Sequence, residues 1–451
     1  MKINLKSLVG VLSVAATAVS VTSCSQSEEM LPVGNTRAAN VVTVSGVINT
    51  NMTWSASNEY HLNGKVYVSG GATLTIQPGT KIVGLYNDVP AKASALVITR
   101  NGKINAAGTA SNPIVMTAES NHQYPGGWGG FVVLGNAPIN QTNNPVIEGI
   151  ESDELPADVD IHYGGSNAND NSGTIQYVRV EYAGANVSQD NELNSFTFGG
   201  VGAGTTFDHC QAYYGEDDAF EFFGGTINGK YLVSTSTHDD AFDFDFGYTG
   251  KLQFLVATVD ANSTYYTKDP NGIECDNDSK GTSLTPFTHP TISNLTIVGT
   301  ADGKVAKSAM SDGKSMKSCA NFRRNCQFTL ANSILYGYPT GILCETSNSY
   351  VFKNNVVNGV STNFSGITAD ATNTAAASVD AIGLTSPWGA YKSQTNLRPN
   401  AAPALSGADF GGLDSWFTVT SYKGAIPPTT GGANWMMQGC LLYTSPSPRD
   451  A

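Results

Sequence analysis

Two acidic segments of nearly the same sequence lie 22 residues apart near the middle of the chain. Residues 215–226 are GEDDAFEFFGGT and residues 238–249 are HDDAFDFDFGYT. At this offset three pairs of carboxylates align: Asp217 with Asp239, Asp218 with Asp240, and Glu221 with Asp243. Carboxylates held close together repel one another unless a cation, a proton or separate hydrogen-bond donors compensate them. Oxygen ligands grouped in this way are typical of Ca²⁺ sites.

These carboxylates allow three interpretations. In the first, each Asp caps its own turn by accepting hydrogen bonds from backbone N–H groups. In the second, the aligned carboxylates bind Ca²⁺, and the ligands are Asp217, Asp218, Asp239, Asp240, Glu221 and Asp243. In the third, Asp218, Asp240 and Glu221 belong to a catalytic centre and supply the two carboxyl groups that glycoside hydrolysis requires.

A polysaccharide lyase needs a base as well as a cation, and two lysines are placed to provide one. A Gly-Lys pair follows each acidic segment, so Lys230 and Lys251 are expected to stack on each other. Either lysine acts as the base if its pKa is lowered; in the alternative, both form salt bridges with the acids. His209 and His238 are isolated and indicate little. The Asn-Thr-Asp, Gly-His-Gly and Arg-Ile-Lys motifs expected of β-helix polygalacturonases are absent from the sequence.

The segments that carry these side chains have the pattern of stacked β-strands. A fixed period in the low twenties, with alternation inside it, indicates a solenoid. Strand side chains alternate between the two faces, so the acids should point outward where the phenylalanines between them point inward. An internal aromatic ladder is therefore expected from Phe220, Phe222, Phe242 and Phe244. Residues 272–276 look like a degenerate third copy.

The same period is expected nearer the N-terminus. Residues 74–76 align with 96–98, and Ile82 aligns with Ile104, again 22 residues apart. Residues 71–80 and 108–114 resemble the opening coils of right-handed parallel β-helix proteins of the pectate-lyase-like class. The resemblance implies an all-β, right-handed parallel β-helix of about 22 residues per coil. We expect it to span residues 41–364, with excursions at 136–171 and 300–325 and an irregular C-terminal cap at 365–439.

Composition supports this fold and limits the partners. The chain has 451 residues with 48 glycines, and only 14% of its residues are charged. Abundant glycine suits many short strands joined by tight turns. The net charge of −13 makes nucleic acids and anionic membrane surfaces poor partners on electrostatic grounds.

Residues 1–24 are expected to be a targeting segment. A basic start and a short apolar stretch precede Val-Thr-Ser-Cys24, which resembles a bacterial lipobox. The resemblance implies cleavage before Cys24 and lipidation of its sulfur. Residues 25–40 are expected to be a flexible tether, and the acidic run within them resembles the surface-export signal of Bacteroidetes lipoproteins. Residues 440–451 resemble translated sequencing-adapter sequence, so we interpret them as a non-native tail.

Five cysteines remain once Cys24 and Cys440 are set aside. Export permits disulfides, so Cys319 and Cys326 are candidates to close a short loop. The alternative is that cysteines fill the core as small apolar side chains. This second interpretation is preferred for Cys210 and Cys275, and no cysteine spacing resembles a zinc site.

The paired acidic segments and the irregular C-terminal region resemble a family of exported Bacteroidetes lipoproteins with β-helix folds and uncharacterised activity. The resemblance implies a monomer, lipid-anchored in the outer membrane and exposed at the cell surface. We expect it to bind a glycan or a partner protein, with Ca²⁺ at the aspartate pairs. The alternative function is a Ca²⁺-dependent polysaccharide lyase or a glycoside hydrolase that uses the same carboxylates.

Aromatic side chains are the candidates for stacking on sugar rings: Trp54, Trp128, Tyr213, Tyr214, Tyr265 and Tyr266. Scattered aromatic residues are also ordinary components of a core or a surface. A compact cleft that brings a Lys or His within hydrogen-bond reach of the acids would favour an enzyme. An open face would favour a binding protein.

Overall fold

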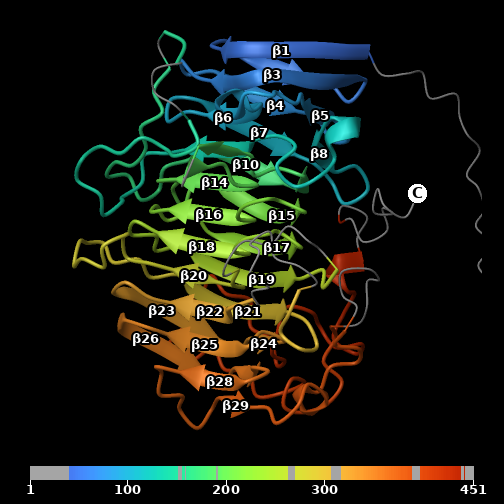
Figure 1. Cartoon of the computed structure of the whole chain (residues 1–451), viewed down its shortest axis with the longest axis vertical. Helices are drawn as coiled ribbons and strands as arrows, with labels where there is room; N and C mark the ends of the chain where they lie inside the picture. Colours follow the sequence, from blue (N-terminus) through green and yellow to red (C-terminus); the bar gives the residue numbers. More distant parts are fainter. Residues whose placement is uncertain are drawn as a thin grey trace, which may run out of the picture. The chain divides into compact units, whose positions relative to one another are not determined.

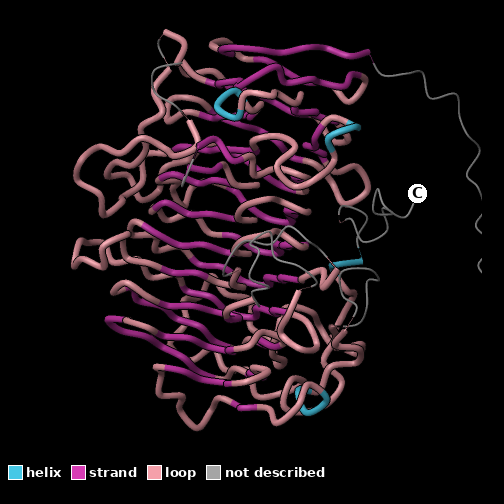
Figure 2. Tube along the Cα trace, in the orientation of Figure 1, coloured by secondary structure: helices cyan, strands magenta, loops and turns pink. Residues whose placement is uncertain are grey.

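The computed structural model describes residues 40–150, 155–157, 159–188, 191–262, 270–305, 316–388, 397–437 and 441. The expected signal peptide with Cys24, the tether up to residue 39, Tyr265, Tyr266 and all of the expected tail except Leu441 lie outside these residues. The described chain forms an all-β, right-handed parallel β-helix, as the sequence predicts. Its coils stack in chain order from β1 to β29 (Figure 1). Helical structure among the described residues is limited to short 3₁₀ turns (Figure 2).

Parallel pairing arranges the strands in three columns, which we call the first, second and third columns. The first column contains β2 (Met52–Trp54), β4 (Thr73–Ile76), β7 (Lys103–Ala107), β10 (Gly173–Gln176), the first halves of β15 (Thr206–Tyr213), β17 (Gly229–Thr235), β19 (Lys251–Thr258) and β21 (Thr291–Val298), then β23 (Cys326–Ala331) and β26 (Ser347–Lys353).

The second column begins with the first halves of β1 and β3 and uses the second halves of the four long strands. Its members are β1 (Asn40–Ile48), β3 (Asn58–Val68), β5 (Lys81–Gly84), β8 (Ile114–Ala118), β11 (Val178–Glu181), β15, β17, β19, β21, β24 (Ile334–Tyr336), β27 (Val356–Asn358) and β29 (Thr374–Ala375).

The third column carries the two acidic segments. After the second halves of β1 and β3 it contains β6 (Ala95–Ile98), β9 (Gly130–Leu134), β14 (Phe196–Gly199), β16 (Phe220–Phe223), β18 (Phe242–Asp245), β20 (Glu274–Cys275), β22 (Ser318–Phe322), β25 (Thr340–Cys344) and β28 (Thr362–Ser365). Outside the columns lie the antiparallel pair β12 (Asn186–Ser188) and β13 (Asn191–Glu192), and the 3₁₀ turns η1 (Pro90–Lys92), η2 (Ser120–His122), η4 (Asp380–Ile382) and η5 (Trp435–Met437).

An aromatic ladder fills the interior beneath the acidic segments. Phe220 stacks on Phe242 with ring centroids 5.4 Å apart, and Phe222 stacks on Phe244 at 5.3 Å. All four rings are fully buried, which confirms the predicted ladder. The ladder continues upward into β14, which contributes two further stacked phenylalanines.

The 22-residue register is confirmed in the middle of the solenoid but is wrong near its start. Glu221 pairs with Asp243 across β16 and β18. By contrast, Leu74 pairs with Ile104, 30 residues later, whereas Leu96 lies in the third column. The N-terminal coils are longer because their turns are longer. The same alternation of apolar and polar residues occurs in all three columns, so it does not reveal to which column a strand belongs.

The excursion at 136–171 is not a solvated insertion. It folds back over the outer face of the third column, to the left of β14 in Figure 1. Its apolar side chains share a buried cluster with strand residues, and the cluster includes Ile147, Ile161, Tyr163, Val132, Leu134 and Phe223. Arg100 pairs with Asp160 at 2.5 Å and adds a polar attachment.

Two expected boundaries are wrong. The excursion at 300–325 is shorter than expected, because residues 318–322 form β22 within the third column. Part of the expected C-terminal cap lies along the side of the solenoid instead of over its end: the Trp416 carbonyl accepts a hydrogen bond from Lys230 at 3.0 Å, and the Trp435 ring contacts Tyr231. This segment covers the outer turns between the first and second columns.

The cysteines support the core interpretation. Cys210, Cys275, Cys319, Cys326 and Cys344 are all free and buried, so the candidate Cys319–Cys326 disulfide is wrong. None of the helices in the described part of the chain is long and apolar enough to cross a bilayer.

Candidate metal centre

Seven carboxylates line the turns that lead from the second column into the third, and the adjacent outer face of the third column. We call them the acidic row: Asp217, Asp218, Glu221, Asp239, Asp240, Asp243 and Glu274. Asp218, Glu221 and Asp240 are buried, and the other four are half-buried. All six predicted metal ligands belong to this row. Glu274, on β20, is the member that the sequence reasoning did not nominate.

Asp218 and Asp240 take part in a ladder of side-chain caps that links successive coils. Asn194 Oδ1 accepts a hydrogen bond from the backbone N–H of Asp218 at 3.1 Å. Asp218 Oδ1 accepts one from the N–H of Asp240 at 2.8 Å. Asp240 Oδ1 accepts one from the N–H of Asn271 at 2.5 Å. The turn-capping interpretation is therefore confirmed for both aspartates.

The capping ladder also shows that capping does not require a carboxylate. The coil above uses Asn194 at this position, and Asn271 occupies the equivalent position in the coil below. An Asn offers one oxygen of the same shape without the charge. Capping occupies only one oxygen of Asp218 and of Asp240, so the second oxygen and the negative charge need a separate explanation.

Within the acidic row, three groups of three residues bring one ligand atom each within 4.8 Å of one another: Asp217, Asp218 and Asp239; Asp218, Glu221 and Asp243; and Asp240, Asp243 and Glu274. Two oxygens that each lie about 2.4 Å from one Ca²⁺ ion are at most about 4.8 Å apart. These clusters of acidic residues could therefore hold a metal ion.

Burial and mutual repulsion oppose ionisation of the row. Burial, followed by the charges of Asp217, Asp243 and other neighbours, raises the pKa of Asp218 well above its usual range. The pKa of Glu221 is raised in the same way by burial and then by Glu148 of the excursion. Burial alone raises the pKa of Glu216, just before the row, to about 7. Without a cation, the row therefore keeps protons at neutral pH.

The donors beside the row fit a hard cation. Asp243 Oδ1 is buried and has no hydrogen-bond partner among the described residues. Thr197 Oγ1, which lies next to Glu221 in the strand register, is also buried and without such a partner. A buried oxygen left without a donor is costly unless an ion or water satisfies it. Carboxylate and hydroxyl oxygens are the ligand types that Ca²⁺ takes.

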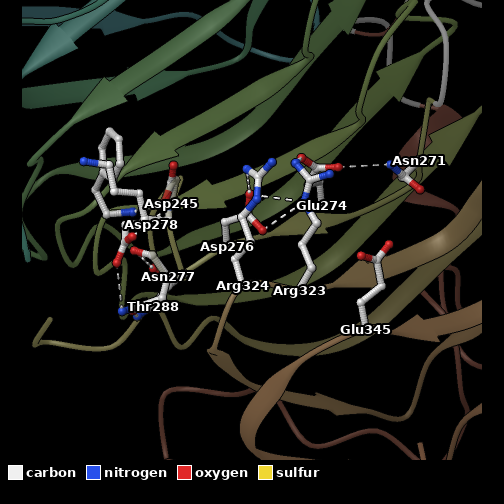
Figure 3. A network of polar contacts seen from close by, with 12 residues as sticks. Asp245, Asn271, Glu274, Asp276, Asn277, Asp278, Thr288, Arg323, Arg324 and Glu345 are labelled. Carbon is white, nitrogen blue, oxygen red and sulfur yellow. Dashed lines mark hydrogen bonds and ion pairs between the residues drawn. The ribbon is translucent and has the colours of Figure 1, made fainter. Parts of the chain in front are cut away.

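The lower end of the row is already neutralised (Figure 3). Arg323 pairs with Glu274, and its Nε lies 2.9 Å from Asp276 Oδ1. Arg324 Nη1 lies 2.6 Å from Asp276 Oδ2. Nearby carboxylates raise the pKa of Arg323 against the effect of its burial, so this guanidinium keeps its charge. The two clusters above Arg323 therefore have the greater need of a metal ion.

A second polar network, at the left in Figure 3, attaches the excursion to the lower coils. Asn140 Nδ2 donates to the Asn277 carbonyl at 2.7 Å. The Asn277 side chain in turn accepts from the Thr288 N–H at 2.9 Å. Hydrogen bonds from Thr282 and its neighbours lower the pKa of Asp278 despite its burial. These groups are satisfied by one another, so this network is structural.

The lysines do not reach the acids. Lys230 lies opposite Gln253, so the expected stacking of Lys230 on Lys251 is wrong. Lys230 Nζ instead donates to Thr418 Oγ1 at 3.0 Å and lies over the Trp416 ring. The salt bridge of Lys251 is with Asp414, at 2.9 Å, not with the acidic row.

The histidines fit no catalytic role in the acidic row. His238 is fully buried beside Asp239, and burial lowers its pKa to about 3, which keeps it neutral. His209 hydrogen-bonds to Asp208 at 2.7 Å and is stacked between Tyr177 and Tyr231.

Most of the nominated aromatic residues do not form a binding face. Trp54, Trp128 and Tyr213 are buried, which is the core alternative considered for them. Tyr214 is half-buried and donates its hydroxyl to Asp260 at 2.7 Å.

The sequence reasoning also missed Asn194, although a signal was present. Residues 194–199 repeat the second acidic-segment pattern, with Asn in place of Asp and Thr in place of the acid.

The comparisons with known proteins give one match. The family model described as a pectate-lyase-like β-helix domain matches residues 46–406. No curated protein and no solved structure matches the chain.

Proposed function

This chain belongs to the family of pectate-lyase-like β-helix domains, and from that membership we propose that it is a surface-exposed lipoprotein that binds a glycan with the help of Ca²⁺. Family membership supports a carbohydrate-related function on a β-helix scaffold. The acidic row supplies the Ca²⁺ site, and the lipid on Cys24 supplies the anchor in the outer membrane. A partner protein is the alternative ligand, and the protein acts as a monomer.

The observation that carries the Ca²⁺ proposal is the pair of aspartates within an asparagine ladder. Asn194 and Asn271 show that this fold caps the same turn without charge. Asp218 and Asp240 are buried, and their burial and like-charged neighbours oppose ionisation. Ca²⁺ bound between them reverses this cost, because the ion compensates the ionised carboxylates.

Binding is favoured over cleavage by the surroundings of the row. Lys230 and Lys251 are engaged by residues 414–418, and Arg323 is held in ion pairs. None of these three residues is therefore free to take a proton from a substrate. The ligand atoms of Asp218, Glu221 and Asp243 lie within 4.8 Å of one another. An inverting glycosidase needs roughly 6.5–9.5 Å between its two carboxyl groups to admit a water molecule.

Calorimetric titration of Ca²⁺ into the EDTA-treated and dialysed chain tests the proposal. We expect saturable binding that is lost in the Asp218→Asn/Asp240→Asn variant. Asp380→Asn, an exposed acid in η4, is the matched control and should bind like the wild type. Wild-type protein that shows no saturable heat would refute the Ca²⁺ site.

The lyase and hydrolase alternatives are tested on the same samples. Ca²⁺-loaded protein is incubated with uronate polymers and with neutral polysaccharides. Lyase cleavage would leave an unsaturated sugar at each new end, and hydrolysis would release reducing ends. We expect neither product. Formation of either one, with loss in the Asp218→Asn/Asp240→Asn variant, would replace the binding function with an enzymatic one.

A further inference from the structure

We propose that Tyr86, His122 and Tyr124 form a stacking platform for a sugar ring, immediately beside the acidic row. The platform lies in the same line of turns as the row, one above the other along the solenoid. This inference rests on the proposed glycan-binding function and gives it a location. The three residues come from two turns, one after β5 and one after β8.

The three rings form one partly exposed aromatic surface. Tyr86 and His122 are stacked with their centroids 3.9 Å apart and their planes only 6° from parallel. Tyr124 lies 5.8 Å from His122 and is tilted by 58°. Tyr86 and Tyr124 are each 39% exposed, in contrast to the buried Trp54, Trp128 and Tyr213.

Backbone hydrogen bonds hold the platform in place. The His122 N–H donates to the Glu119 carbonyl at 2.7 Å, and the Tyr124 N–H donates to the His122 carbonyl at 2.8 Å. The Tyr86 N–H donates to Glu119 Oε2 at 3.4 Å, which joins the two turns. A ligand that stacks on these rings therefore pays little ordering entropy, since the rings are already arranged.

A shared acceptor connects the platform to the acidic row. Gly126, two residues after Tyr124, and Glu216, just before Asp217, both donate their backbone N–H to the Ala183 carbonyl, at 3.0 and 2.9 Å. A Cβ on Gly126 would lie 2.8 Å from Glu216 Oε2, and φ there is +78°, so this approach requires glycine. Burial, Tyr86 and the charge of Glu216 raise the pKa of Tyr124.

The chemistry of this surface fits a pyranose ring. Aromatic faces carry a partial negative charge that attracts the polarised C–H groups on a sugar face. Polar groups around the rings, including Glu119 and Asn121, can bind hydroxyl groups at the ring edge. The turn that carries Tyr86 also contributes Asn87 and Lys92 to a neighbouring pocket of about 280 Å³, whose other polar lining residues include Asn63 and Lys65. A chain longer than one sugar thus has polar sites near the platform.

Affinity electrophoresis of the full chain tests the platform, with native gels that contain pectin, arabinoxylan, mixed-linkage β-glucan or galactomannan. We expect at least one polysaccharide to retard the wild type. Tyr86→Ala and Tyr124→Ala should weaken that binding at least tenfold, and Tyr124→Phe, which keeps the ring, should stay within about twofold. Tyr350→Ala is the control, since Tyr350 is an exposed tyrosine on β26. Unchanged melting temperatures of the variants exclude unfolding as the cause.

The outcomes separate this inference from the proposed function. If the wild type is retarded and both Ala variants are retarded equally, the platform is refuted and glycan binding stands. If Tyr350→Ala weakens binding as much as the platform variants do, the site lies elsewhere and the inference is also refuted. If no polysaccharide retards the wild type, the proposed function and the platform fail together, whatever the Ca²⁺ titration shows.

Discussion

Replacing Asp218 and Asp240 together by Asn should make the metal-free protein more stable at alkaline pH. The new amide oxygens can accept the same backbone N–H bonds, as Asn194 does in the coil above. The new amide nitrogens can donate to the next carboxylate, just as Asn194 Nδ2 donates to Glu221. The double variant therefore removes two charges without removing a cap.

The expected gain follows from the spacing of the row. Two ionised carboxylates 4.8 Å apart repel by about 3.5 kcal/mol at an effective dielectric constant of about 20. Partial protonation already relieves part of this repulsion in the wild type, so we expect a net gain of about 2 kcal/mol. At about 2.1 cal/mol/K per residue over roughly 400 residues, this gain raises Tm by about 2–3 °C.

Calcium should reverse the order of stability. An ion present at about 100 times its dissociation constant stabilises the protein that binds it by about 2.7 kcal/mol, or about 3 °C here. The wild type should gain this increment, whereas the double variant should not. The assay is differential scanning calorimetry of both proteins at pH 5 and pH 8, in EDTA and in excess Ca²⁺.

The pH dependence provides a sign test. Folding raises the pKa of Glu216 from 4.5 to about 7, so the folded state holds more protons than the unfolded state between these values. Stability of the metal-free wild type should therefore fall as pH rises through this window, and the raised pKa values of Asp218 and Asp240 extend the fall. A double variant that is less stable than wild type in EDTA at pH 8 would refute the charge argument.

Three further outcomes are expected. Phe222→Ala removes a ring stacked between two others in the internal ladder, so urea denaturation should show a loss of about 3–5 kcal/mol. Lys251→Met breaks an exposed pair with Asp414, so stability should change by less than about 1 kcal/mol and Ca²⁺ affinity should be unchanged; a lost Ca²⁺ site would contradict the placement of this lysine. Arg323→Met leaves Glu274 without its cation and should cost about 3 kcal/mol at pH 7, with part of the loss recovered at pH 5; equal loss at both values would argue against charge as the cause.

Sequence periodicity was sufficient to predict the fold and the alignment of the acids. The 22-residue offset between the two acidic segments corresponds to one coil, and the strand register pairs Glu221 with Asp243 as predicted. Alternation within the strands placed Phe220 and Phe242 in the interior. These predictions succeeded because a repeat that stacks on itself needs only local pattern and period to be described.

Periodicity failed where the coils differ in length. The early strands were assigned to the wrong columns because Leu74 and Leu96 have similar neighbours but lie on different sides of the solenoid. The part played by Asn194 was also missed, because the charged residues drew attention away from an uncharged residue at the same position. The capping ladder becomes visible only when successive coils are superposed.

By itself, the sequence determined the β-helix, its internal aromatic ladder and the stacking of the aspartate pairs, because each depends on residues one period apart. Only the tertiary structure decided what surrounds the acids. The excursion brings Glu148 toward Glu221, residues 414–418 take up both lysines, and the turns after β5 and β8 assemble Tyr86 beside His122. These segments have no repeat, so their positions follow from long-range packing that no local pattern encodes.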